Sequence, residues 1–176
     1  MSQKRLTILV TSVTGVGHIT ACVGATTELL FRGHRVVFVL EKAWKGKLSS
    51  LGFEEHIYNE CDQPSKTEEN PGEAMAKYLL ESKSIGPYLP EKKMKAMTLY
   101  FKSKANREKF ARVNAAIKEA IELYSPDLIY VDGGLRPAVR ASGIKWIQNF
   151  SANPIFLIID PDLPPGGFGK NFTLNQ

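Results

Sequence analysis

Cysteine and histidine are scarce in this sequence, and their scarcity limits the kinds of site that it can build. The two cysteines, Cys22 and Cys61, form no CxxC pair, and none of the three histidines lies at metal-ligand spacing from either of them. The sequence therefore predicts neither a zinc site nor a disulfide framework. We expect no metal and no cofactor, and the cysteine usage fits a reducing compartment, with the cytoplasm as the default.

Long apolar runs are also missing. No stretch approaches the roughly 18 consecutive apolar residues that a membrane helix needs. The N-terminal MSQKRLTILVTSV contains only a short apolar segment and no small-residue cleavage site, so it is not typical of a signal peptide. We therefore expect no membrane span. Two Asn-x-Ser/Thr triplets, at 149–151 and 171–173, carry little weight as glycosylation sites without a secretion route.

Acidic residues are too few to balance the basic ones. Eighteen Asp and Glu stand against 23 Lys and Arg, which gives a formal net charge of +5, and the basic residues concentrate between Lys92 and Lys118. This balance makes nucleic acid a partner to consider. A charge run of this kind is, however, usually the solvated face of a helix, and the interleaved aromatic residues of single-strand binders are missing. Nucleic acid is thus a minor alternative, and we expect no such partner.

The 176 residues do contain a regular alternation of strand and helix patterns. Apolar runs at 5–11, 35–40, 127–132 and 144–150, together with a more polar run at 53–58, predict five strands of a parallel sheet. Helical patterns connect them: from Ile19 to Gly33, a short helix ending at Gly52, a long segment at 72–124 broken at 86–90, and a short helix at 135–142. The alternation predicts a doubly wound, Rossmann-like α/β domain.

The sequence also predicts which helix packs against the sheet and where the regular structure ends. An apolar stripe in the long helical segment is predicted to pack against the sheet: Phe110, Val113, Ile117, Ile121 and Tyr124. The polar stretch 59–71 and the Pro- and Gly-rich stretch 160–176 have no periodicity and are predicted to be loops or a frayed end. We expect one domain over 1–176, because a second full domain would not fit in this length.

One histidine and one aspartate stand where this fold binds its ligands. Ligands of open α/β sheets lie beyond the carboxyl ends of the strands, at the point where the strand order reverses. His18 follows the first predicted strand and Asp132 ends the fourth, so the common order 3-2-1-4 brings them together. A carboxylate can hold the imidazole N–H and stabilise the imidazolium, which favours a general base. Alternatively, His18 only caps the helix and Asp132 only holds a turn with Gly133; spacing alone does not decide.

The same loop also raises a nucleotide alternative. Gly15 and Gly17 supply the first two glycines of a G-x-G-x-x-G dinucleotide fingerprint, and Glu41 ends the second predicted strand, where an acidic residue would bind a ribose. The third glycine is replaced by Thr20, and His18 stands where a pyrophosphate would approach the backbone. An NAD(P)-binding oxidoreductase domain is therefore the second hypothesis.

Three stretches carry a resemblance to a known family. ILVTSVTGVGHITACVGATTELLFRGHRVVFVLE at 8–41, WKGKLSSLGFEEHIY at 44–58 and PDLIYVDGG at 126–134 resemble the N-terminal half of the UDP-glycosyltransferases, glycosyltransferase family 1, which have the two-domain GT-B fold. The sequence is most similar to the arthropod members, especially those of mites and other arachnids. The resemblance covers most of the chain.

The resemblance implies an activity and roles for particular residues. It implies inverting transfer of a hexose, with glucose as the expected sugar, from a UDP-sugar donor substrate to a hydroxyl of a small lipophilic acceptor. By position, His18 matches the family's base and Asp132 its partner carboxylate. Acceptor contacts are expected at Gly15, Gly17 and Ile19 of the same loop, and Trp44, just past the second strand, is expected either to pack in the core or to line an apolar acceptor pocket.

Two departures from the family pattern shape the expectation. Ala21 stands where many members have proline, which affects the start of the helix but not the chemistry. The C-terminal domain that makes most UDP-sugar contacts in the family has no counterpart here, so we expect a partial acceptor-binding domain that is inactive alone. A non-catalytic remnant that binds small ligands is the third hypothesis.

Overall fold

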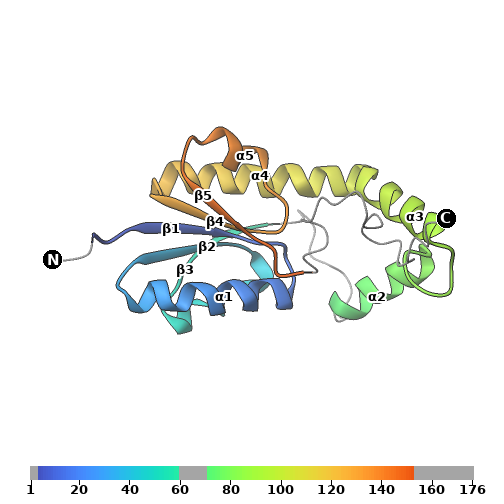
Figure 1. Cartoon of the computed structure of the whole chain (residues 1–176), viewed down its shortest axis with the longest axis horizontal. Helices are drawn as coiled ribbons and strands as arrows, with labels where there is room; N and C mark the ends of the chain where they lie inside the picture. The colour runs from blue at the N-terminus through green and yellow to red at the C-terminus, as the bar shows by residue number, and fades with distance from the viewer. Residues whose placement is uncertain (1–3, 60–70, 153–176) are drawn as a thin grey trace, which may run out of the picture. The chain divides into compact units, whose positions relative to one another are not determined.

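The computed structural model describes residues 4–59 and 71–152, which form two compact units. The first unit comprises 4–59 and 109–152, and the second comprises 71–108. Figure 1 shows the elements of both. The predicted loop at 59–71, apart from its two end residues, lies outside the described residues. Cys61 and the predicted loop at 160–176 also lie outside them.

The first unit is built on a parallel sheet of five strands. The strands are β1 (Thr7–Thr11), β2 (Arg35–Glu41), β3 (Glu54–Tyr58), β4 (Leu128–Asp132) and β5 (Trp146–Asn149). They lie in the order β3-β2-β1-β4-β5, with β1 at the centre. Leu9 of β1 pairs with Val37 of β2 and Ile129 of β4. The five predicted strands are confirmed, and so is the predicted order 3-2-1-4 of the first four. The central strands β1, β2 and β4 carry the apolar runs that are typical of strands covered on both faces.

Helices cover both faces of this sheet, as Figure 1 shows: α1 (Val16–Phe31) lies on one side, and α4 (Lys104–Tyr124) and α5 (Pro137–Ala141) lie on the other. Alternate side chains of a strand point to opposite faces, so the unit has two cores. The core on the α1 side includes Ile8, Val10, Ile19, Cys22, Val36 and Phe38. The core on the α4 side includes Leu9, Val37, Val113, Ile117, Ile129 and Val139.

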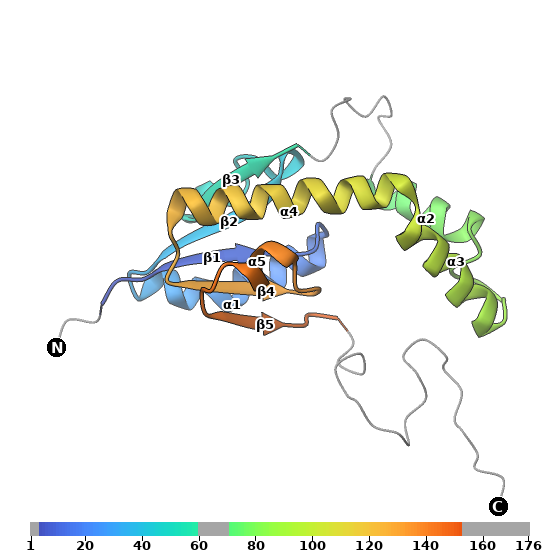
Figure 2. The ribbon, with the colours of Figure 1, turned by 90° about the horizontal axis from the view of Figure 1, so that it is seen from above.

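The apolar stripe of α4 packs as predicted, and Figure 2 shows this helix lying along the sheet beside α5. Val113 and Ile117 are buried, and Ile121 and Tyr124 pack against the same core. Phe110 differs in its neighbour, because its ring lies 4.3 Å below the Arg136 guanidinium carbon. The amphipathic spacing therefore identified the core face of this helix correctly over most of its length.

One predicted helix start and one predicted helix are wrong. The helix α1 begins at Val16, three residues before Ile19, so His18 lies in its first turn. The predicted helix ending at Gly52 is instead two 3-10 turns, η1 (Lys42–Trp44) and η2 (Ser49–Leu51). Between them Gly46 takes a φ of +80°, which a helix cannot accommodate. The backbone N–H groups of Gly46, Leu48 and Ser49 donate to the Glu55 carboxylate instead of to helical carbonyls.

The second unit contains α2 (Pro71–Glu81), α3 (Pro90–Lys102) and the first residues of α4. The predicted break at 86–90 is confirmed, and a further break occurs at Ser103. There the backbone is extended, and the Ser103 hydroxyl accepts a hydrogen bond from the Asn106 N–H, which caps the start of α4. Within the described residues, no helix combines the length and apolar character needed to span a bilayer.

Candidate active site

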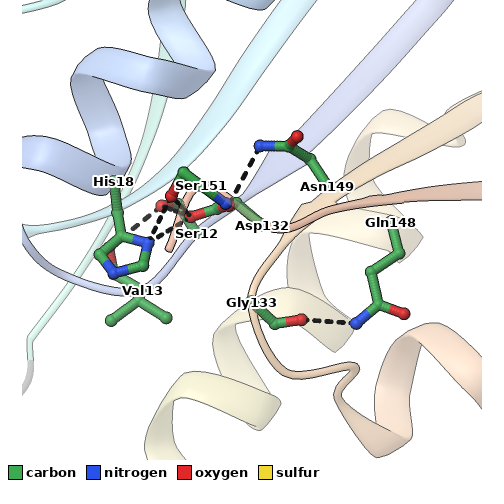
Figure 3. A network of polar contacts seen from close by, with 8 residues as sticks. All are labelled: Ser12, Val13, His18, Asp132, Gly133, Gln148, Asn149 and Ser151. Atoms are coloured by element: carbon green, nitrogen blue, oxygen red, sulfur yellow. Dashed lines mark hydrogen bonds and ion pairs between the residues drawn. The ribbon is translucent and has the colours of Figure 1, made fainter. Parts of the chain in front are cut away.

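The fold brings His18 and Asp132 into direct contact. Asp132 ends β4, and His18 lies in the first turn of α1, directly after the loop that follows β1. Their contact joins His18 Nδ1 to Asp132 Oδ2 at 2.6 Å (Figure 3). The backbone of Gly15 caps α1 in an extended conformation, and no side chain makes a cap hydrogen bond there. The alternative in which His18 serves only as a helix cap therefore does not apply.

The Asp132 carboxylate is fully buried, with 0% of its side chain exposed, and donors surround it. Oδ1 accepts from the Asn149 side-chain amide at 3.1 Å and from the Ser151 backbone N–H at 2.9 Å. Oδ2 faces His18 and also lies 3.5 Å from the Ser12 hydroxyl. A buried carboxylate is costly unless such partners satisfy it. The two oxygens thus have different partners. Oδ1 holds the carboxylate against the end of β5, and Oδ2 contacts the histidine.

Ser151 closes a triangle with His18 and Asp132. Its hydroxyl lies 2.8 Å from His18 Nδ1 and 3.0 Å from Asp132 Oδ2. This arrangement differs from a hydrolase triad, in which serine and aspartate contact opposite nitrogens of the imidazole. Here both contact Nδ1, so the histidine does not activate the serine. Instead, Ser151 helps to hold the Nδ1–H proton toward the carboxylate.

The other ring nitrogen of His18 is left open by this arrangement. With Nδ1 protonated, the lone pair of the neutral imidazole lies on Nε2. Among the described residues, none donates to or accepts from Nε2, and 30% of the His18 side chain is exposed. His34 and His56, in contrast, are only 7% and 8% exposed. The site therefore presents one accessible basic nitrogen, backed by a buried carboxylate.

The loop after β4 is shaped closely around the site. Gly133 takes a φ of +84°, and a Cβ added to it would lie 2.8 Å from Val13 Cγ2, so only glycine fits. The Gly133 carbonyl accepts a hydrogen bond from the Gln148 amide at 2.7 Å (Figure 3). Strand β5 therefore fixes this turn as well as the carboxylate of Asp132.

Cys22 is the one cysteine among the described residues, and it is not poised as a nucleophile. Burial raises the pKa of its thiol to about 11, and the charge of Asp132 adds to this effect. The thiolate is the nucleophilic form of cysteine. Cys22 thus serves as a core residue beneath α1.

The four residues expected to contact the acceptor occupy different places. Gly15 is the N-cap of α1, and Gly17 lies in the first turn with open space around its Cα. Both are beside His18. Ile19 is 2% exposed and packs in the core on the α1 side, while Trp44 is partly buried against the same core. His18 and the two glycines are therefore brought together, and Ile19 and Trp44 are turned toward the interior of the unit.

Sequence reasoning missed three residues of the network: Ser12, Asn149 and Ser151. Asn149 and Ser151 attracted notice only as a glycosylation triplet, yet both bind Asp132. The predicted order 3-2-1-4 did not place the fifth strand, whereas the structure pairs β5 with β4. The polar residues at the carboxyl end of β5 therefore lie beside those of β4.

The architecture is shared with solved glycosyltransferases. The glycosyltransferase SsfS6 of Streptomyces sp. SF2575 matches 83% of this chain with a TM-score of 0.51 and 14% identity, over 39% of its own length. UGT89C1 of Arabidopsis thaliana, solved with UDP-L-rhamnose, matches 83% with a TM-score of 0.50 and 18% identity, over 36% of its own length. The fold is that of the N-terminal domain of GT-B glycosyltransferases.

The coverage and the sequence identity decide what this similarity shows. The chain spans less than two fifths of the length of these glycosyltransferases, and the low identities establish a common fold. SsfS6 was also solved with thymidine diphosphate, so nucleotide ligands occur in both of these proteins. No family profile and no curated protein sequence matches the chain.

Proposed function

We propose that this chain is the acceptor-side portion of a UDP-glycosyltransferase of family 1, akin to the arthropod members, in which His18 is the general base. The observation that carries the proposal is the 2.6 Å contact between His18 and the buried Asp132, with Nε2 left open. It lies at the carboxyl ends of β1 and β4, where the strand order reverses and where α/β sheets bind ligands. The glycosyltransferase fold supports the same proposal.

The proposed chemistry follows from the arrangement of the pair. The acceptor hydroxyl gives its proton to Nε2 of His18 while its oxygen attacks the anomeric carbon of the sugar. A new carbon–oxygen bond forms on one face, the bond to UDP breaks on the other, and the configuration inverts. The Asp132 carboxylate stabilises the imidazolium through Nδ1–H. General-base assistance of this kind contributes on the order of 10² to 10⁴ in rate.

The surroundings of His18 favour a lipophilic acceptor. Val13 and Val16 precede His18 in the same loop and first helical turn, and they are 39% and 72% exposed, although both are apolar. Exposed apolar side chains next to a reactive group are typical of surfaces that receive an apolar ligand. We accordingly propose a small lipophilic hydroxyl compound as acceptor and a hexose, with glucose as the first sugar to test, as the transferred group.

We further propose that residues 1–176 form a partial acceptor-binding domain, located in the cytoplasm, that does not turn over a UDP-sugar by itself. The match to SsfS6 covers only 39% of that enzyme, which leaves most of its chain without a counterpart in the match. Formation of a glycoside by the purified chain from UDP-glucose and a phenol would contradict this part of the proposal. It would leave the role of His18 intact.

Histidine modification tests the proposed acceptor site directly. Diethyl pyrocarbonate acylates accessible imidazoles, and of the three histidines only His18 is well exposed. We expect His18 to react first, as read by mass spectrometry of peptides, and a lipophilic phenol such as 2-naphthol to slow this reaction. UDP-glucose and NAD should have little effect. The variant His18→Gln is the control, because it should lose the fast-reacting site and keep the sheet intact.

The other outcomes separate the competing hypotheses. Saturable protection by NAD would overturn the acceptor-site proposal and favour the dinucleotide hypothesis, with Gly15, Gly17 and Glu41 as its residues. Absence of protection by any phenol in a broad panel would also contradict the proposal. Protection by phenols, in contrast, supports an acceptor half-site around His18.

A further inference from the structure

The second compact unit contains a cavity of its own, between α2 and α3. Its volume is about 450 Å³, within the range of small-molecule pockets, and its lining is largely apolar. Leu99 and Ala96 of α3 contribute to that lining. The described lining residues all belong to residues 78–103, so this cavity lies inside one unit. None of its described lining residues belongs to the network around His18.

Two aromatic side chains form part of the wall. The rings of Tyr78 on α2 and Tyr100 on α3 lie 5.0 Å apart and are tilted by 49°. Tyr78 is 38% exposed and Leu99 is 62% exposed, so the apolar surface of the cavity remains open to solvent. Aromatic rings that line an open cavity suit a planar aromatic ligand, which can pack against them.

The charge around the cavity has one sign. Lys83, Lys92 and Lys95 line it, and none of the described lining residues is acidic. No ion pair within the described part of the chain engages these three lysines. Lys83 does contact an aromatic ring, since its Nζ lies 5.8 Å from the centre of Tyr88. Three cationic groups without a carboxylate partner are complementary to an anion.

The placement of Lys83 adds an independent observation. It has a φ of +63° at the end of α2, a left-handed conformation that normally selects glycine or asparagine. The turn is held by hydrogen bonds from Lys83 N to Leu80 O and from Ser84 N to Leu79 O. A lysine here costs conformational energy, and such strain in a pocket wall is typical of a functional position. The strained residue supplies one of the three charges.

We infer that this cavity is a binding site for a small aromatic anion, a planar ring system bearing a carboxylate. The ring packs against Tyr78, Tyr100 and Leu99, and the carboxylate lies among the lysine ammonium groups. The inference does not depend on glycosyl transfer, because its residues are separate from His18 and Asp132. Ligand binding to this cavity is measured at side chains other than His18, so the two proposals can fail independently.

A matched pair of ligands tests the charge and the shape separately. We would titrate the whole chain with 2-naphthoate and with 2-naphthamide, which have the same ring system and differ in charge. Binding is followed by NMR through the ring signals of Tyr78 and Tyr100 and the methyl signal of Ala96. We expect both ligands to shift these signals, and 2-naphthoate to bind at least about fivefold more tightly at low salt. This advantage should shrink as salt screens the lysines.

Variants then assign the two contributions. Lys92→Gln with Lys95→Gln should weaken 2-naphthoate about fivefold or more and leave 2-naphthamide unchanged. Lys118→Gln, an exposed lysine of α4 outside the lining, is the control and should change neither affinity. Ala96→Phe should fill the cavity and weaken both ligands, with unchanged signals from the sheet showing that the chain is folded. Equal affinity for the two ligands, an equal loss in Lys118→Gln, or no saturable shift would overturn the inference.

Discussion

At the level of single residues, the carboxylate of Asp132 is the group on which the candidate site depends. It receives the His18 and Ser151 side chains at one oxygen and the Asn149 amide and Ser151 N–H at the other. Both oxygens accept in the native arrangement. An isosteric amide fits this environment only with its NH₂ group toward His18 and Ser151, and the imidazole then has to move its proton from Nδ1 to Nε2 so that Nδ1 can accept.

We therefore predict that Asp132→Asn both destabilises the chain and loosens His18. The cost is about 1–3 kcal/mol in the free energy of unfolding, since hydrogen bonds to a charged carboxylate are replaced by weaker ones to a neutral amide. The proton of the imidazole should no longer be confined to Nδ1. Urea unfolding measures the first effect, and the ¹⁵N chemical shifts of the His18 ring, which distinguish the two tautomers, measure the second.

Asp127→Asn is the matched control for this substitution. Asp127 also accepts a backbone N–H, that of Thr7 at 2.9 Å, but its other oxygen is bound only by the exposed Lys4. An asparagine can keep the backbone hydrogen bond there, so its effect should be within a few tenths of a kcal/mol. An Asp132→Asn chain that is as stable as this control, with a single Nδ1–H tautomer, would contradict the role assigned to Asp132.

The pairing of His18 with Asp132 was predictable from sequence, whereas the hydrogen bonds from Asn149 and Ser151 that hold Asp132 were not. The pairing needs only the strand order and the rule that ligands bind at the carboxyl ends of strands. Predicting those hydrogen bonds requires the exact end of β5, because Ser151 binds Asp132 two residues past the last paired residue, Asn149. Strand ends are the least certain part of a pattern-based prediction, so Ser151 and Asn149 had no distinct signal.

At the level of elements, the connection between β2 and β3 shows why one prediction failed. The spacing of residues 42–52 favoured a helix, but Glu55 of β3 accepts three backbone N–H groups from this segment, at 2.6, 2.7 and 2.9 Å. Partial burial opposes the charged form of Glu55, yet the three hydrogen bonds outweigh it and hold its pKa below the ordinary value. A tertiary contact has thus overridden local helix propensity.

This connection leads to a prediction of pH dependence. A carboxylate with a lowered pKa stabilises the folded state above its unfolded pKa of about 4.3, and this contribution is lost as the pH falls through the lower folded pKa. Glu55→Gln should therefore be less stable than the parent at pH 7, by on the order of 1 kcal/mol, because an amide offers a single accepting oxygen. The difference should shrink toward zero below pH 4, as measured by urea unfolding across pH.

Glu122→Gln provides the comparison, since Glu122 is an exposed residue of α4 in a loose ion pair with Lys118 at 3.8 Å. Its stability difference from the parent should stay within a few tenths of a kcal/mol at every pH. A difference for Glu55→Gln that does not shrink as the pH falls from 7 to well below 4 would show that the charge of Glu55 is not what holds the turns.

At the level of the whole molecule, the two compact units differ in how much apolar surface they bury. Among the described residues, the buried apolar side chains all belong to the first unit, in the two cores on either face of its sheet. In the described part of the second unit, the buried residues are the polar Ser84 and Asn106, and α3 has none. Burial of apolar surface is the main stabilising term in folding, so the units should differ in stability.

Native-state hydrogen exchange tests this difference. Amides of α3 should exchange at least about tenfold faster than those of α1, after correction for intrinsic rates, because α3 opens without disrupting a core. The comparison is matched, since the helices have 13 and 16 residues and α1 buries Ile19, Cys22 and Thr26. Ile129→Ala sharpens it: removing a fully buried side chain of β4 should lower the protection of α1 and the sheet by about 2–4 kcal/mol and leave α3 unchanged. Protection of α3 that falls in step with the sheet would instead mean that both units unfold as one.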